Sequence, residues 1–92
     1  MSLAPLPDLF LYGRPGCHLC EDALEILTDL LAARARAGLA APTLIERNID
    51  TDPAWQRAYF ETIPVVELGG RRIELATSPG RIGRLLRDVL DA

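Results

Sequence analysis

The two cysteines of the chain, its only ones, stand three residues apart in the sequence Cys17-His18-Leu19-Cys20. A short apolar run over residues 8–12 precedes them, and it ends at a turn sequence that contains Pro15 and Gly16. An amphipathic helix is expected to follow from His18 to Ala37, with Gly38 as its stop. Its apolar side chains recur at three- and four-residue steps: Cys20, Ala23, Leu24, Leu27, Leu30 and Leu31. The cysteine pair therefore lies between a predicted buried strand and the first turn of a long predicted helix.

The remaining sequence predicts a strand, a short helix, a hairpin and a final helix. The expected strands span residues 43–49, 65–68 and 71–75, and the expected helices span residues 53–60 and 79 to the C-terminus. Asp52 and Ser78 are the expected helix caps, because each is a capping residue type that directly precedes a proline. Gly69-Gly70 is a strong signal for a two-residue hairpin turn. The aromatic side chains of the short helix, Trp55, Tyr59 and Phe60, are expected to pack against the core.

The order of these elements, βαβα-ββα, predicts an α/β fold. Two strands joined by a helix pair in parallel, whereas a hairpin adds an antiparallel pair. The result is a mixed four-stranded sheet with helices on both faces. A chain of 92 residues buries only roughly 60 to 65% of its unfolded surface, so residues 1–92 are expected to form a single domain.

Composition and charge limit the classes of function. The chain is 49% hydrophobic and 25% charged, which is typical of a soluble globular protein. Its net charge of −3 argues against a nucleic-acid partner, because neutralising phosphates requires a basic surface. No apolar run reaches the ~20 residues of a membrane span, and residues 1–7 lack the pattern of a signal peptide. We therefore expect a cytoplasmic protein with no membrane partner.

The position of Cys17 predicts redox chemistry. Unpaired backbone N–H groups at a helix start stabilise a thiolate, which is the reactive form of cysteine. A protonated His18 and Arg14 would add to this effect, and the carboxylates of Glu21 and Asp22 would oppose it. Cys20 is one turn further on and belongs to the apolar stripe, so it is the expected resolving thiol that attacks a mixed disulfide at Cys17.

Other interpretations of the pair remain open. A Cys-x-x-Cys can form half of a zinc site, but with one histidine and no further cysteine the chain cannot complete a tetrahedral N/S site by itself. Metal or cluster binding would then require a dimer bridged through Cys17. An inert pair in the core is another alternative, and His18 is either a group that tunes Cys17 or a solvent-exposed side chain. We expect no metal and no organic cofactor.

The chain resembles the thioredoxin superfamily, and most closely the small glutaredoxin-like proteins of bacteria. The resemblance covers residues 8–91 and rests on the Gly-Cys-His-Leu-Cys segment at residues 16–20 and on Thr62-Ile63-Pro64-Val65, which looks like the family's Thr-Val-Pro loop. It implies a thioredoxin-like fold of the glutaredoxin type, a cis peptide before Pro64, and pairing of the Ile63 backbone with a substrate peptide or glutathione. Cis peptides are almost confined to X-Pro bonds, so this implication is physically consistent.

The sequence also departs from the glutaredoxin pattern. Glutaredoxins usually have Cys-Pro-Tyr-Cys, and after the hairpin they carry a Gly-Gly-x-Asp segment that holds the glutamyl end of glutathione. Here the aligned stretch, residues 74–78, reads Glu-Leu-Ala-Thr-Ser. The remaining candidates for holding a glutathione carboxylate are Arg14 and the backbone N–H groups of Thr77 and Ser78 at a helix start.

The leading hypothesis is a thiol-disulfide oxidoreductase in which Cys17 attacks, Cys20 resolves and Pro64 shapes the substrate groove. Its expected partners are protein or glutathione mixed disulfides and a thiol reductant, with glutathione as a candidate co-substrate. The alternative is a non-catalytic thioredoxin-like module that binds a partner or senses oxidation through the same cysteines.

Overall fold

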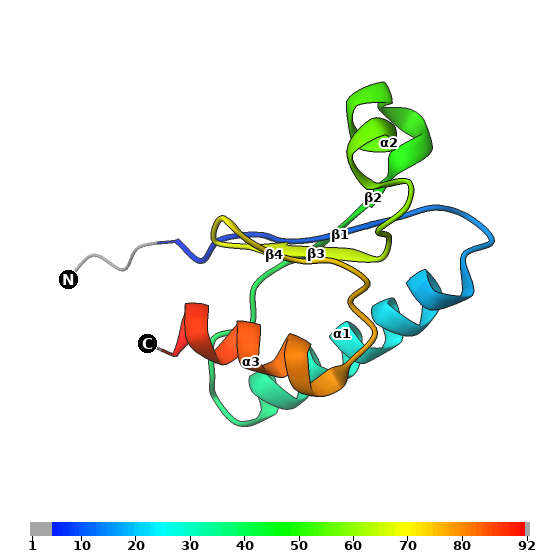
Figure 1. The fold of residues 1–92 in the computed structure, drawn as a ribbon. Coiled ribbons are helices and arrows are strands. Elements are labelled where there is room, and N and C mark those ends of the chain that lie inside the picture. The colour runs from blue at the N-terminus through cyan, green and yellow to red at the C-terminus, as the bar shows by residue number, and fades with distance from the viewer. Residues whose placement is uncertain (1–4, 92) are drawn as a thin grey trace.

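The computed structural model describes residues 5–91, and its elements follow the predicted order (Figure 1). They are β1 (Leu9–Gly13), α1 (His18–Arg36), β2 (Leu44–Asn48), the single-turn 3-10 helix η1 (Ile49–Thr51), α2 (Pro53–Tyr59), β3 (Val65–Leu68), β4 (Arg71–Ile73) and α3 (Pro79–Leu90). No helix within residues 5–91 has the length and apolar character needed to cross a membrane.

The four strands form one mixed sheet in the order β2-β1-β3-β4. Strand β1 pairs in parallel with β2, with Leu9 opposite Leu44, and it pairs antiparallel with β3, with Tyr12 opposite Val65. Strand β4 completes the hairpin with β3. Helices α1 and α3 cover one face and α2 lies on the other (Figure 1). The predicted fold class is confirmed.

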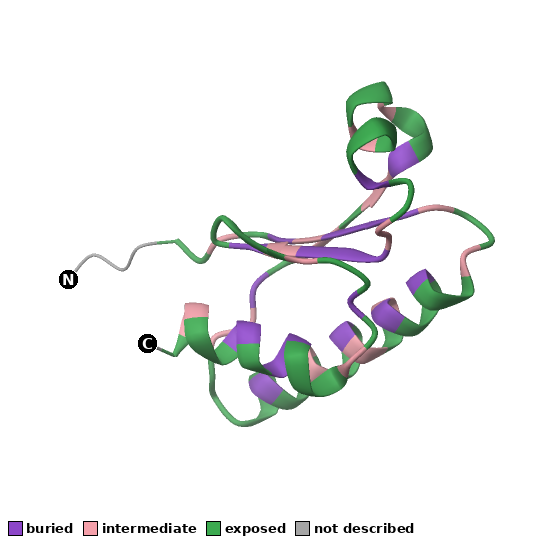
Figure 2. Cartoon of the chain, in the orientation of Figure 1, coloured by how far each residue is buried: buried purple, intermediate pink, exposed green. Residues whose placement is uncertain are grey.

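Side chains of β1 alternate between two apolar clusters, one on each face of the sheet. Leu9 and Leu11 join the larger cluster under α1 and α3, whereas Tyr12 belongs to the smaller cluster beside α2. Figure 2 shows the buried positions of α1 and α3 on the sides that face the sheet. The larger cluster consists of Leu9, Leu11, Ala23, Leu27, Val66, Leu68, Ala76, Ile82, Leu85 and Leu86. Strand β1 therefore contributes to both apolar clusters, and its C-terminal end leads directly into the turn before Cys17.

The local signals in the sequence have the expected structural roles. Asp52 accepts a hydrogen bond from the Ala54 N–H at the start of α2, and Ser78 accepts one from the Arg81 N–H at the start of α3. Gly69 and Gly70 both have positive φ angles, 57° and 79°, as a tight hairpin turn between right-twisted strands requires.

Two expectations about the second half of the chain were wrong. Strand β4 ends at Ile73 rather than Leu75, because Leu75 adopts a φ of 48° and its N–H leaves the ladder to bond the Thr62 carbonyl at 2.9 Å. Phe60 does not pack into the core: it follows the last residue of α2 and is 54% exposed, whereas Tyr59 is buried.

A buried arginine joins the C-terminal ends of α1 and α3. The side chain of Arg34 donates through Nε to the Ala40 carbonyl at 2.6 Å and through Nη1 to Asp91 Oδ2 at 3.0 Å, and its Nη2 pairs with the second oxygen of the same carboxylate. The hydrogen bonds from Arg34 lower the pKa of Asp91; the charges of Arg34 and Arg87 act in the same direction, and burial opposes them.

We expect this ion pair to make the fold sensitive to acid. Because the pKa of Asp91 is lower in the folded protein, its stabilising effect is complete above the ordinary pKa of aspartate and is lost as the pH falls through the folded value. An Asp91→Asn variant should be less stable than wild type at neutral pH, and its free energy of unfolding should fall less between about pH 5 and about pH 2. Urea titrations at several pH values test this, with Asp29→Asn on the exposed face of α1 as control. Equal pH dependence in wild type and Asp91→Asn would contradict it.

Candidate functional site

The turn between β1 and α1 places Cys17 at the start of the helix. Pro15 and Gly16 occupy the central positions of a turn that is closed by a hydrogen bond from the Cys17 N–H to the Arg14 carbonyl at 3.4 Å. Gly16 has a φ of 79°, a conformation that a type II turn requires at this position and that glycine adopts without strain. Cys17 is the N-cap of α1, with extended backbone angles.

Cys17 and Cys20 form a disulfide across the first turn of α1, with their Cα atoms 5.2 Å apart. The Cys17 Sγ also accepts a hydrogen bond from the backbone N–H of Cys20 at 3.1 Å. Cys17 is half-buried, whereas Cys20 is only 7% exposed and lies on the side of the helix that faces the sheet. An incoming group can therefore reach the sulfur of Cys17 more readily than that of Cys20.

Gly13, at the end of β1, lies directly against Cys20. A Cβ atom at position 13 would stand 3.0 Å from the Cβ of Cys20 and 3.1 Å from its Sγ, which is tighter than normal van der Waals contact. Only glycine therefore lets the strand pass this close to the sulfur. Gly13 was not among the predicted site residues, although a glycine at the end of a buried strand is a signal for close approach of the backbone.

The Ile63-Pro64 peptide is cis, as the resemblance implied. Pro64 directly precedes β3, and because Tyr12 pairs with Val65, it lies beside the Gly13 end of β1. The segment is held by two backbone hydrogen bonds, from the Leu75 N–H to the Thr62 carbonyl at 2.9 Å and from the Ala76 N–H to the Pro64 carbonyl at 2.8 Å. We call residues 62–64 together with residues 75–76 the proline clasp.

The backbone of Ile63 is less available than expected. Its N–H donates to the carbonyl of Tyr59 at 3.1 Å, within the turn that ends α2. The expected pairing of the Ile63 backbone with a ligand would therefore not use this N–H as it is placed here. Of the two groups, the carbonyl is the one that remains for pairing with an extended ligand.

Arg14 is bound by Asp50, a residue that no pattern in the sequence marks as part of the site. Its guanidinium forms an ion pair with Asp50 of η1, which also accepts a hydrogen bond from Gln56 Nε2 at 3.3 Å. The hydrogen bond and charge of Asp50 raise the pKa of Arg14, and the hydrogen bond from Arg14 in turn lowers the pKa of Asp50. Arg14 thus joins the turn before Cys17 to η1, and its charge is already matched.

The other candidate residues lie at the surface around the disulfide. The side chain of His18 is 94% exposed, with Nδ1 3.6 Å from Glu21 Oε2, and Leu19 is 49% exposed. Thr77 is exposed, but its N–H donates to the Leu75 carbonyl at 2.8 Å, so the expectation that this N–H is free to hold a carboxylate was wrong. The hydroxyl of Ser78 accepts a hydrogen bond from the Arg81 N–H at the start of α3. Within residues 5–91 no group of three or more histidine, cysteine, aspartate or glutamate side chains is placed to hold a metal ion.

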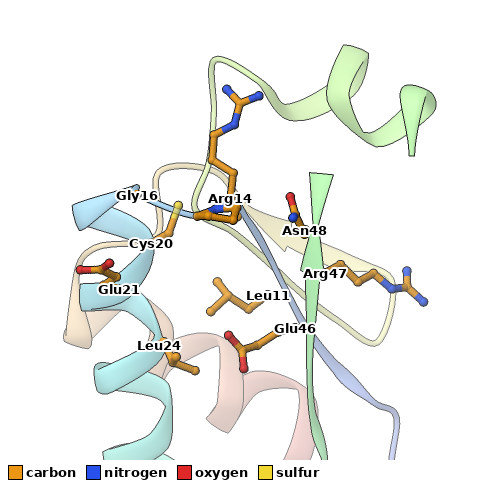
Figure 3. Close-up of a pocket in the computed structure, with 11 residues that line it drawn as sticks. Leu11, Arg14, Gly16, Cys20, Glu21, Leu24, Glu46, Arg47 and Asn48 are labelled. Atoms are coloured by element: carbon orange, nitrogen blue, oxygen red, sulfur yellow. The ribbon is translucent and has the colours of Figure 1, made fainter. Parts of the chain in front are cut away.

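A cleft of about 390 Å³ opens behind the disulfide, between α1 and β2. Figure 3 shows Leu11, Leu24 and Glu46 pointing into it below the Cys20 sulfur, with Asn48 at its upper end. Because β2 and β3 flank β1 on opposite sides, this cleft and Pro64 approach the site from different directions. Three of its polar residues, Glu46, Arg47 and Asn48, lie in β2, where no motif marked them. Strand alternation alone places Glu46 on the same face as Leu11.

An arginine and several aromatic rings support the other face of β1. Arg47 lies 3.9 Å from the ring centroid of Phe10 and donates a hydrogen bond from Nη1 to the Tyr12 hydroxyl at 2.9 Å. Burial raises the pKa of Tyr12, and the hydrogen bond from Arg47 acts in the opposite direction. These contacts fix the end of β1 immediately before Gly13.

Comparison with family models matches residues 8–88 to the glutaredoxin-like domain (DUF836). Among solved structures, the X-ray structure of protein XcR50 from X. campestris has 33% identity and a TM-score of 0.68, covering 87% of this chain and 96% of that one. The solution structure of XcR50 has 34% identity and a TM-score of 0.63, covering 88% and 94%. Protein Ne2328 from Nitrosomonas europaea has 25% identity and a TM-score of 0.62, covering 92% and 96%. A comparison with curated proteins gives no match.

Proposed function

The chain belongs to the glutaredoxin-like family, and from this premise we propose that it is a thiol-disulfide oxidoreductase that uses Cys17 and Cys20 as its redox dithiol. The observation that carries the proposal is the unequal placement of the two sulfurs. Cys17 is the half-buried cap of α1, and Cys20 is nearly fully buried against Gly13. Such an arrangement suits one attacking and one resolving thiol.

The exchange proceeds in two balanced steps. The Cys17 thiolate attacks one sulfur of a substrate disulfide, forms a mixed disulfide with it and releases the other substrate thiolate. Cys20 then loses its proton, attacks the sulfur of Cys17 and releases the second substrate thiolate. Two electrons pass from the dithiol to the substrate, and a thiol reductant restores the pair by the reverse sequence. These steps require neither a metal nor an organic cofactor.

The start of α1 supplies the activation of Cys17. The Cys20 N–H that bonds the Cys17 sulfur is one of the unpaired donors of the first turn, and it stabilises a thiolate at the same position. An effect of this kind at a helix terminus favours the thiolate by up to about 2 kcal/mol. Arg14 contributes little to the stability of the thiolate because Asp50 already neutralises its charge. Any charge on the side chain of His18, which is 94% exposed, is screened by solvent. The helix start is therefore the main source of activation.

The substrate would approach from the side of the proline clasp. Pro64 lies beside Gly13, and the Ile63 carbonyl is the backbone acceptor that remains for an extended peptide. Glutathione is a candidate co-substrate, with the backbone N–H of Ser78 at the start of α3 as the group that would hold its carboxylate in place of the Gly-Gly-x-Asp segment. Protein disulfides need only the backbone and the exposed apolar surface of Leu19 and Leu75, which are 49% and 50% exposed.

A direct test uses the wild-type protein with two substrates, insulin and a glutathione mixed disulfide of a small thiol. We expect both to be reduced faster than by the thiol reductant alone. Brief treatment of the reduced protein with limiting iodoacetamide should label Cys17 before Cys20 and remove the activity in proportion to the label. No rate above the reductant alone with either substrate would reject the enzyme and favour the non-catalytic module, and earlier labelling of Cys20 would reverse the two roles.

A further inference from the structure

The hairpin and α3 carry a positive region on an otherwise acidic chain. Residues 71–88 contain five arginines and two acidic residues, a net charge of +3, although the whole chain has a net charge of −3. The other residues therefore have a net charge of −6. The segment from β4 through most of α3 is therefore positively charged, although the protein as a whole is negatively charged.

Four of these arginines line a groove between β4 and α3. The groove has a volume of about 140 Å³, and its walls include Arg71 of β4 and Arg81 and Arg84 of α3. The side chains of Arg81 and Arg84 project from the same face of α3, because they are three residues apart. Arg72 also lines the groove, but its guanidinium donates to the Tyr59 hydroxyl at 3.2 Å. We call this feature the arginine groove.

The positive charge of the groove is only partly matched within the described residues. Arg71 Nη1 lies 3.6 Å from Asp88 Oδ2, an exposed pair with a long separation. Neither Arg81 nor Arg84 forms an ion pair with an acidic side chain of residues 5–91, and both are exposed. Two like charges one helical turn apart weaken an isolated helix slightly. An anionic partner would remove that cost.

The groove borders an open edge of the sheet. Strand β4 is the last strand in the order β2-β1-β3-β4, so within the described residues its outer backbone groups have no strand partner. Charged side chains on an edge strand discourage pairing with a second copy of the same edge. The same arginines attract an extended segment of opposite charge, which could add to the edge by backbone pairing. The favoured occupant is therefore an acidic peptide segment rather than another copy of this chain.

The Arg81 end of the arginine groove is the end nearer the redox site in the chain, whereas Arg71 pairs with Leu68, and Leu68 pairs with Leu9 at the opposite end of β1 from Gly13. Ala76 of the proline clasp is two residues before Ser78, which caps α3, and Arg81 is in the first turn of that helix. Helix α3 packs against β3, whereas α1 packs against β1, so the groove and α1 lie toward different edges of the sheet. Helix α1 exposes the acidic residues Glu21, Asp22, Glu25 and Asp29. A substrate at Cys17 thus meets positive charge toward α3 and negative charge toward α1.

We propose that the arginine groove binds an extended acidic segment of the protein whose disulfide this dithiol reduces. The proposal rests on the proposed function and adds to it a class of substrate: a protein disulfide with acidic residues on one side of its reactive cysteine. Recognition by exposed charge pairs acts mainly on the rate of encounter and on the choice of partner. The preference is opposite to that expected from net charge, because a chain with a charge of −3 should repel an acidic substrate.

The first experiment compares disulfide-linked peptides of equal length with acidic, neutral or basic residues on either the N-terminal or the C-terminal side of the cysteine. At low salt we expect kcat/KM for one of the two acidic peptides to exceed that for the neutral peptide by about tenfold, and salt to remove the difference. The double variant Arg81→Gln/Arg84→Gln should lose the preference and keep the rate with the neutral peptide. The double variant Arg36→Gln/Arg57→Gln, with the same change in charge at exposed sites elsewhere, should keep both.

Several outcomes would overturn the proposal while leaving the enzyme intact. The first is an equal kcat/KM for the acidic and the neutral peptides. The second is an equal increase in kcat/KM whether the acidic residues stand on the N-terminal or the C-terminal side of the cysteine. The third is an equal loss of the preference for acidic peptides in the two double variants. In each case reduction of the neutral peptide still shows the oxidoreductase activity. These results would therefore show that the groove does not bind acidic segments without contradicting the proposed oxidoreductase activity.

A binding measurement keeps the groove testable even if the protein is not an enzyme. Fluorescence anisotropy of a cysteine-free acidic peptide with the oxidised wild-type protein should show binding that Arg81→Gln/Arg84→Gln weakens about tenfold. The absence of binding would reject the groove as a peptide site. Equal binding of a single-stranded oligonucleotide of the same charge would reject an acidic protein segment as its occupant.

Discussion

Replacement of Cys17 by serine is expected to reduce the rate of disulfide reduction by about 1,000-fold or more, because a hydroxyl at this position does not ionise near neutral pH and cannot attack a disulfide. Helix α1 should keep its cap, since serine is a favoured N-cap residue and its oxygen can accept the Cys20 N–H that now bonds the sulfur. The steady-state rate with insulin measures the loss, and circular dichroism checks the fold. A Cys17→Ser variant with more than a tenth of the wild-type rate would contradict the assignment.

The Cys20→Ser variant should behave differently, because it retains the attacking thiol. We expect it to form a mixed disulfide with a substrate peptide and to hold it, since no resolving thiol is present to release the product. Mass spectrometry of the oxidised variant should show one peptide joined to Cys17. Full wild-type turnover of a protein disulfide by Cys20→Ser would show that Cys20 is not required for resolution.

The second large effect is expected at Gly13, which touches no substrate. A Gly13→Ala variant places a methyl group 3.0 Å from the Cβ of Cys20, so either β1 or the first turn of α1 must shift. Overpacking of this kind costs about 1–3 kcal/mol in the free energy of unfolding. Chemical denaturation of the oxidised protein measures the cost. The matched control is Gly80→Ala, whose new methyl group would lie 3.7 Å from the Ser78 hydroxyl, an ordinary contact.

The Gly13→Ala variant also tests whether Gly13 positions Cys20 for disulfide formation or only stabilises the fold. In the oxidised protein Cys20 is tied to Cys17 and can move less, so the methyl group should destabilise the disulfide form more than the dithiol form. Each 1.4 kcal/mol of difference would raise the reduction potential by about 30 mV. Equilibration with glutathione buffers gives the potential of wild type, Gly13→Ala and Gly80→Ala. An unchanged potential in Gly13→Ala would show that Gly13 serves stability alone.

Much of the architecture could be predicted because its signals are local. The apolar run before Pro15, the stripe of α1 and the Gly69-Gly70 turn each depend on neighbouring residues, and each predicts its element in the right order. The caps at Asp52 and Ser78 are equally local, since a short polar side chain before a proline satisfies the N–H groups of the following turn.

The contacts between distant segments could not be predicted in this way. The pairing of Arg14 with Asp50 joins residues 36 positions apart, and nothing in the sequence around Asp50 distinguishes it from any exposed aspartate. The engagement of the Ile63 N–H by Tyr59 depends on how α2 ends, which propensities leave uncertain by a residue or two. Phe60 shows the same limit, because a shift of one position decides whether an aromatic side chain at the end of a helix faces the core or solvent.

The proline clasp has a consequence for which proteins can be substrates. Its two hydrogen bonds join the loop before β3 to the segment that leads into α3, so the backbone of the first turn of α3 is held in place relative to Pro64. If a polypeptide binds at both Cys17 and the arginine groove as proposed, we expect its acidic residues to lie within a limited range of positions from its cysteine. The proline clasp would then make the protein select substrates by the number of residues between their cysteine and their acidic residues, as well as by charge.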